Sequence, residues 1–468
     1  MTPSRDLPEF PPNFKGDIVL RGDPSYPDAI RRWARSAERQ AAIVAYIKDS
    51  ADTAIALAYA RQHGLPIAIK GGGHSSAGAS SVEDGLVIDC SRYMNYCHVD
   101  AERKIARVGG GATWETVDTA AYKHGLSIVG GTVNDTGVAG LTLGGGFGFL
   151  SGQYGLAIDN LLEVTIVTAD GSTLLASPTE HPDLFFGIRG GGSNFGVVTE
   201  FVFRANDQKR LVFTGLVTFP TTAYSSVVEA FQQYWDAHDP KACAFLALGA
   251  TAKSGILCML FYDGSEEEGR AHFKTLFDIG PSSDRAKATP YDEVNGILGK
   301  VFPPGRCDYQ KSIACPIPTV PLANELIQRI DEFDASEGPS LLAVFYAWPQ
   351  HAIAEHRHQD CAFRHNLYPE LVFIAQYMDN TPDNKEVARA RVRELHGIVS
   401  RSEIVSGMSL SERAGYGNHD AEAASSDLER RAQSSRDAFG DVYPRLQKIK
   451  KMYDPDMVFD RWRPIQPA

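Results

Sequence analysis

GGGHSSAG occupies residues 71–78 and directly follows the short apolar run PIAIK at residues 66–70. This run is typical of a buried strand, and helical spacing of apolar residues over 50–63 precedes it. Glycines after a strand present successive backbone N–H groups with no Cβ in the way, which suits a phosphate or pyrophosphate. A tight turn without a ligand fits the same loop equally well.

Two further glycine-rich stretches follow, GGTVNDTGVAGLTLGGGFG at 130–148 and RGGGSNFGVV at 189–198. The first contains a spacing close to G-x-G-x-x-G. No β-branched strand precedes it and no clear helix follows it, so the Rossmann dinucleotide fingerprint is disfavoured. The second again leads glycine-rich backbone into a strand. Three such loops in one region predict a large, flat ligand that lies on backbone.

Length and composition limit the number of domains and the classes of partner that this chain can have. A chain of 468 residues exceeds the usual size of one hydrophobic core, so two domains are expected. A formal net charge of −12 disfavours nucleic acid and anionic membrane surfaces as partners. Seven cysteines without a C-x-x-C pair argue against a disulfide scaffold or a zinc site. Prolines and charges in the first 16 residues disfavour a secretory signal, so we expect a soluble, cytoplasmic protein.

The pattern of elements changes near residue 205. Before that point, short strands and helices are mixed, with hairpin turns at 100–103 and 169–171. After it the glycine runs stop. Amphipathic helices are expected at 222–235, 321–330 and 384–395, a capping box at Ser265 and Glu268, and strands at 255–262, 340–348 and 370–378. This second part predicts a sheet with helices on one side, and residues 427–453 predict a helical tail.

The motifs together resemble a known family. GGGHSSAG (71–78), RVGGGATW (107–114), GLTLGGGFGFLSGQYGLAIDNL (140–161) and GGGSNFGVVTEF (190–201) resemble the FAD-binding domain of the vanillyl-alcohol oxidase superfamily, specifically berberine bridge enzyme-like oxidases. The tail YPRLQKIKKMYDPDMVF (443–459) is similar to the C-terminal signature of that family. The resemblance implies an α+β fold with a PCMH-type FAD-binding domain over 1–205. It also implies an antiparallel-sheet substrate domain covered by helices over 206–424, and a segment over 425–468 that returns to the FAD domain.

The same resemblance implies how FAD is held. The histidine of the G-G-H loop, here His74, carries the flavin through its 8α carbon. Many members add a second link from a cysteine, but Val133 stands at that position, so a single covalent bond is expected. From local sequence alone, a hydrogen-bonded loop histidine is the simpler interpretation of His74. The other expected cofactor contacts are Gly71, Gly72, Gly73, Ser75, Ser76, Gly78, Gly131, Thr132, Thr136, Gly137, Gly140, Gly144, Gly145, Phe147, Gly148, Gly196, Val198 and Asn418.

The catalytic residues of the family are only partly present in this sequence. Ser76 and Phe147 stand where plant members carry tyrosines, so both hydroxyls are missing. The strand motif IAQYM implies that Gln376 lies over the flavin, and Tyr416-Gly417-Asn418 matches a Y-x-N motif in which Tyr416 acts as base and Asn418 supports it. Two alternatives remain open: Gln376 pairs only within its sheet, and Tyr416 is a packed aromatic with a hydrogen-bonded tip.

The resemblance implies an oxidase that transfers hydride from a C–H next to O or N to FAD and reduces O2 to H2O2. A small aromatic, alkaloid or polyketide-like substrate is favoured. Thr136 occupies the position that gates oxygen, and its valine-like size predicts that oxygen is admitted. The alternatives are a dehydrogenase with another acceptor and a catalytically silent flavin-binding protein. His351, His356, His358 and His365 lack the spacing of a metal site and are expected to be exposed loop residues.

Overall fold

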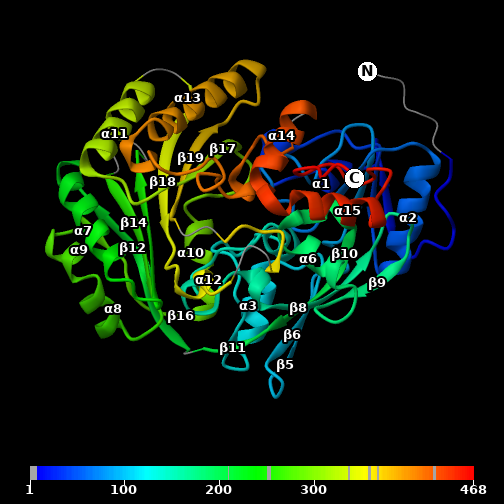
Figure 1. Ribbon diagram of the computed structural model, residues 1–468, viewed down its shortest axis with the longest axis horizontal. Coiled ribbons are helices and arrows are strands. Elements are labelled where there is room, and N and C mark those ends of the chain that lie inside the picture. The colour runs from blue at the N-terminus through cyan, green and yellow to red at the C-terminus, as the bar shows by residue number, and fades with distance from the viewer. Residues whose placement is uncertain are drawn as a thin grey trace.

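The computed structural model describes residues 8–208, 210–249, 255–335, 338–356, 360–365, 368–424 and 428–468. The fold is α+β, as the sequence predicts. Figure 1 shows two adjoining halves, one built on a large sheet with helices on its outer face and one built on smaller sheets. Short helices lie in the connections: α1 Tyr26–Ala29, α5 Ser151–Tyr154, α10 Gly296–Gly299 and α12 His351–Ala354.

A four-stranded sheet carries the first glycine loop. Its order is β1 (Asp17–Leu20), β2 (Ile43–Tyr46), β4 (Leu86–Asp89) and β3 (Ile67–Lys70), and the last three strands run parallel. Helix α2 (Ser50–Gln62) precedes β3, and the Asp49 side chain caps it by accepting the N–H of Asp52. Strand β3 ends at Lys70, directly before the glycines. The predicted strand and glycine loop are therefore confirmed.

A second, antiparallel sheet continues the same half. Its order is β5 (Cys97–Asp100), β6 (Ile105–Gly109), β10 (Val197–Arg204), β8 (Leu161–Val167) and β9 (Thr173–Ala176). The hairpins β5–β6 and β8–β9 turn at the predicted places. Helices α3 (Trp114–Tyr122), α4 (Val138–Leu143) and α6 (Pro182–Gly191) contribute to its core, and the short strands β7 (Leu126–Ser127) and β11 (Asn206–Asp207) pair beside it.

The large sheet has eight strands and is antiparallel. Its order is β15-β12-β14-β13-β18-β19-β17, and β16 also pairs with β12. The strands are β12 Leu211–Phe219, β13 Ala242–Leu248, β14 Ile256–Tyr262, β15 Ser283–Asp284, β16 Lys287–Pro290, β17 Cys307–Ala314, β18 Ser340–Ala347 and β19 Glu370–Tyr377. Helices α7 (Tyr224–Asp236), α8 (Glu266–His272), α9 (Lys274–Asp278), α11 (Val320–Asp334) and α13 (Pro382–Ser400) cover one face (Figure 1). The capping box at Ser265 and Glu268 opens α8, as predicted.

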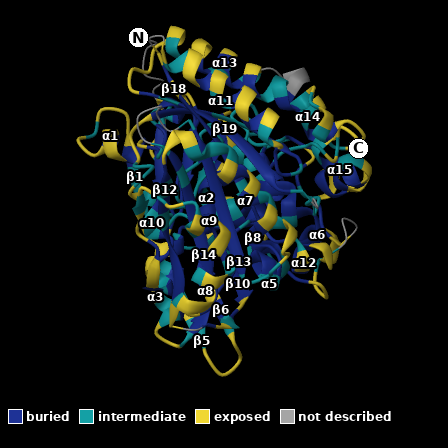
Figure 2. Cartoon of the chain, turned by 90° about the vertical axis from the view of Figure 1, so that its left-hand side faces the viewer, coloured by how far each residue is buried: buried dark blue, intermediate teal, exposed yellow. Residues whose placement is uncertain are grey.

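The two faces of this sheet differ in chemistry because side chains alternate along each strand. On β19, Leu371 and Phe373 belong to the core under the helices. Ile374 and Gln376 point the other way, toward the first half of the chain. Figure 2 shows the strands of this sheet as buried, whereas the outer faces of α11 and α13 are exposed. The face without helices is therefore available to build a site.

The C-terminal residues pack against the half of the molecule that contains the glycine loops (Figure 1). Helix α15 (Tyr443–Tyr453) contacts α6, and the buried Lys450 ammonium lies 2.6 Å from Asp454 and donates to the Asn194 and Phe459 carbonyls. The predicted helical tail is interrupted, because Gly440 takes φ +50° between α14 (Leu428–Phe439) and α15. Residue 427 of that prediction lies outside the described residues. The domain boundaries at 205 and 424 stay predictions.

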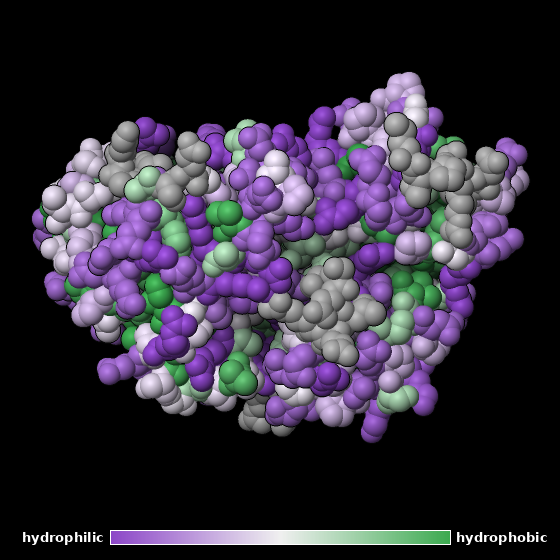
Figure 3. Space-filling model, turned by 90° about the horizontal axis from the view of Figure 1, so that it is seen from above, coloured by the Kyte–Doolittle hydropathy of each residue, from purple (hydrophilic) through white to green (hydrophobic). Residues whose placement is uncertain are grey.

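The surface is mostly polar where Figure 3 displays it, with hydrophobic side chains in small separate groups. Among the described residues, the most exposed large apolar side chains are Leu410, Met452 and Met378, which come from different segments. No helix in the described part of the chain combines the length and the apolar character needed to cross a membrane.

Candidate active site

A cavity of about 1670 Å³, including its open mouth, lies between the glycine loops and the free face of the large sheet. The cavity is open to solvent on one side and is lined by both polar and apolar side chains, as ligand-binding clefts usually are. We call its two sides the loop wall and the sheet wall. The loop wall comes from residues 69–80, 132–144 and 192–193, and the sheet wall from Asp308, Gln310, Tyr346, Trp348, Ile374 and Gln376.

The loop wall is built by close contact between two glycine loops. A Cβ on Gly72 would lie 2.5 Å from Gly137 N, and a Cβ on Gly137 would lie 2.3 Å from Gly72 N. Neither position therefore accepts a side chain without displacing backbone. At Gly140, by contrast, a Cβ would meet no atom within 4 Å. The loops thus pack tightly against each other and still leave their cavity side open to a ligand that rests on backbone.

His74 lies on the loop wall between an aromatic ring and a carboxylate. Its imidazole stacks on Trp33, with ring centroids 4.5 Å apart and planes inclined by 24°. Its Nε2 atom lies 3.3 Å from Asp135 Oδ1, although the contact lacks hydrogen-bond geometry. A carboxylate on this side favours the tautomer with the proton on Nε2, which leaves the lone pair on Nδ1. Nδ1 is then the nucleophilic nitrogen.

Two buried polar atoms on the loop wall, Trp33 Nε1 and Ser80 Oγ, have no hydrogen-bond partner in the protein. Buried polar groups are almost always satisfied, so these atoms indicate a polar ligand at this wall. A long ligand with a flat ring system and a phosphate-bearing tail matches both these atoms and the exposed glycine backbone. The residues present therefore fit FAD.

Tyr416 closes one end of the cavity, where the two walls meet. Its phenolic oxygen accepts hydrogen bonds from Gly146 N at 3.1 Å and Asn418 Nδ2 at 2.7 Å. The hydroxyl also lies 3.4 Å from the Leu141 carbonyl, to which it donates. Burial raises the pKa of Tyr416, whereas the Gly146 and Asn418 donors oppose that rise because they stabilise phenolate. The hydroxyl is thus buried but held by groups that favour its ionised form.

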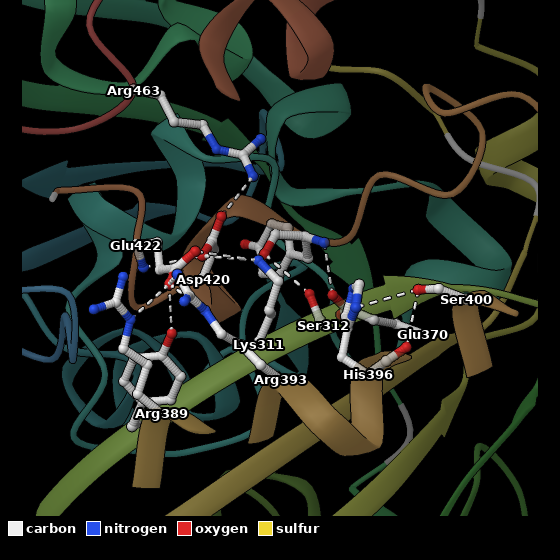
Figure 4. Close-up of polar contacts among 12 residues, drawn as sticks. Lys311, Ser312, Glu370, Arg389, Arg393, His396, Ser400, Asp420, Glu422 and Arg463 are labelled. Atoms are coloured by element: carbon white, nitrogen blue, oxygen red, sulfur yellow. Dashed lines mark hydrogen bonds and ion pairs between the residues drawn. The ribbon is translucent and has the colours of Figure 1, made fainter. Parts of the chain in front are cut away.

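The segment that carries Tyr416 is fixed from outside the cavity by charged residues. Figure 4 shows Glu422 between Arg389 and Arg393, with Lys311 beside it. Asp420 lies 3.6 Å from Arg463 Nη2. Closer to the cavity, Glu370 on β19 accepts the Tyr416 backbone N–H at 2.7 Å and lies 3.1 Å from His419 Nδ1. These contacts attach residues 416–422 to the edge of the large sheet and hold the Tyr416 ring in place.

The sheet wall carries residues that sequence reasoning missed. Asp308 and Gln310 lie on β17, and the Gln310 side-chain amide donates to Asp308 Oδ2 at 3.0 Å. Asp308 is 3% exposed, and burial raises the pKa of its carboxyl to about 7 against the hydrogen bond from Gln310. Cys307-Asp308-Tyr309-Gln310 alternates apolar and polar residues, and this period of two was the available signal.

Most predicted site residues line the cavity: Gly71, Gly72, Gly73, His74, Ser75, Ser76, Thr132, Thr136, Gly137, Gly140, Gly144, Phe147, Gln376, Tyr416 and Asn418. Six lie outside its wall: Gly78, Gly131, Gly145, Gly148, Gly196 and Val198. At Gly148 a Cβ would lie 1.8 Å from the Gly130 carbonyl, so this glycine permits close packing behind the loops. Contact of these six with a cofactor stays a prediction. Trp33, Ser80, Gly192, Ser193, Phe302, Tyr346, Trp348, His419 and Trp462 also line the cavity and were not predicted.

The expectation of exposed loop histidines is wrong for His365. Its side chain is 2% exposed, and Nε2 lies 2.9 Å from Asp159 Oδ1. Burial lowers the pKa of His365, but the hydrogen bonds and charges of Asp159 and Cys361 together outweigh burial and raise the value to about 9. His356 lies 3.7 Å from the same carboxylate, and His358 lies outside the described residues. Within the described part of the chain, no three histidine, cysteine or acidic side chains group as metal ligands.

Comparison with known proteins agrees with this geometry. A family model described as "FAD binding domain" matches residues 41–177, and one described as "Berberine and berberine like" matches residues 416–465, beginning at Tyr416. The chain thus carries an FAD-binding domain and a berberine-like C-terminal segment, and its relatives are FAD-linked oxidoreductases. The protein is therefore an FAD-dependent enzyme.

Two relatives align over nearly their whole length. The FAD-linked oxidoreductase pgmH of Aspergillus terreus is 29% identical over 497 aligned positions, which cover 99% of this chain and 96% of the relative. The (R)-6-hydroxynicotine oxidase of Paenarthrobacter nicotinovorans is 27% identical, with 96% of each chain covered.

Solved structures share the fold. The 6-hydroxy-D-nicotine oxidase of Arthrobacter nicotinovorans has a TM-score of 0.87 and 25% identity, with 98% of this chain and 99% of that chain covered. A chitooligosaccharide oxidase has a TM-score of 0.81 and 21% identity, with 97% and 98% covered. At 21% identity, the similarity to the chitooligosaccharide oxidase is a similarity of fold alone. Together they show the two-part α+β architecture of flavin oxidases.

Proposed function

We propose that this FAD-linked oxidoreductase is an oxidase that removes hydride from a C–H bond next to O or N of a small organic substrate. The observation that carries the proposal is that one cavity is lined by both His74 and Tyr416. When bound there, FAD would supply the redox chemistry, with O2 as the final electron acceptor and H2O2 as its product. The substrate loses one proton and one hydride and becomes a carbonyl compound or an imine.

His74 is proposed to hold the flavin through one covalent bond. The Asp135 carboxylate near Nε2 supports Nδ1 as the bonding atom, and the Trp33 ring fixes the plane of the imidazole. Val133 lines the cavity where a cysteine would be required for a second bond. Ser75, Ser76 and the glycine backbone of the loop wall are left to bind the polar parts of the cofactor.

Tyr416 is proposed to receive the proton from the substrate heteroatom. A phenol with its ordinary pKa of ~10 is ionised in only about one molecule per thousand at neutral pH, and burial raises the pKa further. The hydrogen bonds from Gly146 and Asn418 favour phenolate and lower this cost. Tyr416 can accept the proton only as phenolate, so the proposed reaction proceeds from the ionised fraction that these two donors stabilise.

The aromatic side chains of the cavity support a flat substrate. Phe147 stacks with Trp348 at a centroid distance of 5.6 Å and meets Tyr416 edge-on at 5.2 Å. Tyr346 and Trp348 are nearly parallel, with planes inclined by 9°. Such surfaces favour aromatic or heteroaromatic molecules through stacking. We therefore favour an aromatic, alkaloid or polyketide-like substrate, as the sequence suggests.

Anaerobic mixing of the holoenzyme with a panel of aromatic alcohols and aromatic amines tests the proposal. A substrate should bleach the oxidised flavin, and admission of air should restore its absorbance and release one peroxide per turnover. Bleaching that air does not reverse, but that an added quinone does, would identify a dehydrogenase. A flavin that the whole panel leaves oxidised would favour a silent binding protein.

A further inference from the structure

Asp308 is the most unusual charged group of the sheet wall. It lies on β17 with its carboxyl on the cavity side, and only 3% of the residue is exposed. Oδ2 accepts the Gln310 amide at 3.0 Å, and the Gln376 amide on β19 also acts on the carboxyl, but Oδ1 makes no hydrogen bond of good geometry within the protein. A buried carboxylate oxygen without a partner is costly unless a ligand satisfies it. This oxygen is therefore a candidate ligand contact.

The basic side chains on the described cavity lining are the imidazoles of His74 and His419, and His419 lies 3.1 Å from Glu370. Among the described residues that line the cavity, none is lysine or arginine. The Arg306 guanidinium is engaged with Gln376 Oε1 at 3.3 Å. The charged or titratable groups around Asp308 are Cys307 and Arg306 on its own segment, Tyr346 on β18, Tyr377 on β19 and His419 on the C-terminal segment.

The aromatic rings of the sheet wall add to this preference. Tyr346 and Trp348 lie on the same cavity wall as Asp308 and present a stacked pair of rings. The negative face of an aromatic ring attracts ammonium groups. An anionic substrate would find no lysine or arginine on the described lining, whereas a cationic substrate would find a carboxylate beside two aromatic rings.

We infer that Asp308 binds a cationic nitrogen of the substrate, so that the enzyme takes an amine. The inference rests on the proposed function, because it chooses nitrogen over oxygen as the heteroatom beside the oxidised carbon. Asp308 is ionised only above its pKa of about 7, so binding of a cation is expected to strengthen as the pH rises through neutrality. Below that pH the neutral carboxyl loses its attraction for the cation.

Two probes of nearly equal shape test this without turnover. Benzyltrimethylammonium carries a permanent positive charge, and neopentylbenzene replaces its nitrogen by carbon. The perturbation of the flavin absorbance of the holoenzyme gives their dissociation constants between pH 6 and pH 8. The cation should bind about tenfold more tightly at pH 8 than at pH 6, as expected for a group of pKa about 7. The neutral probe should show no pH dependence.

Asp308→Asn removes the charge at nearly constant shape and should abolish both the tight binding of the cation and its pH dependence. Asp118→Asn is the matched control, because Asp118 is another buried carboxyl with a raised pKa but lies outside the cavity lining. It should bind the cation as the wild type does. If wild-type protein prefers neopentylbenzene, or fails to bind the cation saturably, the inference is wrong whether or not Asp308→Asn folds.

The binding test of Asp308 and the bleaching test of the proposed function can succeed or fail independently. Charge-selective binding that depends on Asp308 supports the inference even if no compound bleaches the flavin. Equal bleaching by amines and alcohols, with cation binding that ignores Asp308, would overturn the inference and leave the oxidase proposal standing.

Discussion

The loop wall and the sheet wall of the cavity use different parts of the polypeptide to do their work. The loop wall is glycine backbone, with Gly72 and Gly137 in direct contact and His74 as its one imidazole. The sheet wall is made of side chains on alternate strand positions, including Asp308, Gln310 and Gln376. Backbone contacts suit a cofactor that is the same in every reaction. Side chains on a rigid sheet can be substituted without altering the backbone, so they suit the choice of substrate. The contrast teaches that attachment of FAD and choice of substrate should be separable by mutation.

Tyr416→Phe should produce the largest effect. Removing the hydroxyl deprives the reaction of its proton acceptor, so flavin reduction should slow by about 10²–10⁴-fold, the usual worth of acid–base catalysis. FAD content should not change, because the ring still packs on Phe147. Rapid mixing with a substrate under anaerobic conditions measures the rate.

Tyr234→Phe is the control for that variant. Tyr234 is similarly buried, and its hydroxyl donates to the Ala347 carbonyl at 3.2 Å on the helix side of the sheet. Its loss should leave flavin reduction within a few fold of wild type. Equal slowing by both substitutions would make Tyr416 a packing residue.

Asp135→Ala should disturb the loop wall alone. The Asp135 carboxylate lies 3.3 Å from His74 Nε2 and favours one orientation of the imidazole, and a partly exposed contact of this kind is worth up to ~1 kcal/mol, or about fivefold in rate. Covalent attachment of FAD to flavin-starved apoprotein should therefore slow by that factor. Acid precipitation at timed intervals separates bound from free flavin. Unchanged attachment with weaker substrate binding would contradict the separation of the two walls.

Thr136→Leu should act on the oxygen reaction alone. Thr136 lines the loop wall, and a larger side chain there is expected to obstruct oxygen. Reoxidation of photoreduced protein should slow about tenfold, equivalent to ~1.4 kcal/mol of barrier. Anaerobic reduction by substrate should stay the same. Stopped-flow mixing with oxygen provides the test, and rapid reoxidation of the variant would remove the gating role.

Asp118→Asn should give the smallest effect, at the contact between α3 and the large-sheet half. Asn295 donates to Asp118 at 2.6 Å, and burial raises the pKa of Asp118 to about 8. A carboxyl with a raised folded-state pKa stabilises below its ordinary value of ~3.9, and this contribution is lost as pH rises through 8. The Tm of the wild type should thus fall relative to the Tm of the variant between pH 5 and pH 8. The relative fall should be about 2–5 °C at pH 8. If the difference in Tm between wild type and variant stays constant from pH 5 to pH 8, Asp118 is ionised throughout that range.

The same contrast explains which features the sequence predicts. Glycine runs, His74 and the Y-x-N motif are local patterns, and the family resemblance that they carry is what singles out the loop wall and Tyr416. Asp308 and Tyr346 come together only through strand pairing of β17, β19 and β18, which no local pattern encodes. Individual strands and helices of the large sheet follow their hydrophobic periods. Their order in the sheet does not, because it depends on contacts between distant segments.

The attachment of FAD to His74 is the central claim and has a direct test. Intact-mass measurement of the denatured protein should show the polypeptide plus one FAD, and His74→Ala should show the polypeptide alone. Proteolysis should place the flavin on the peptide that contains residues 71–78. Release of all FAD from the denatured wild type, or retention of its mass by His74→Ala, would contradict the account.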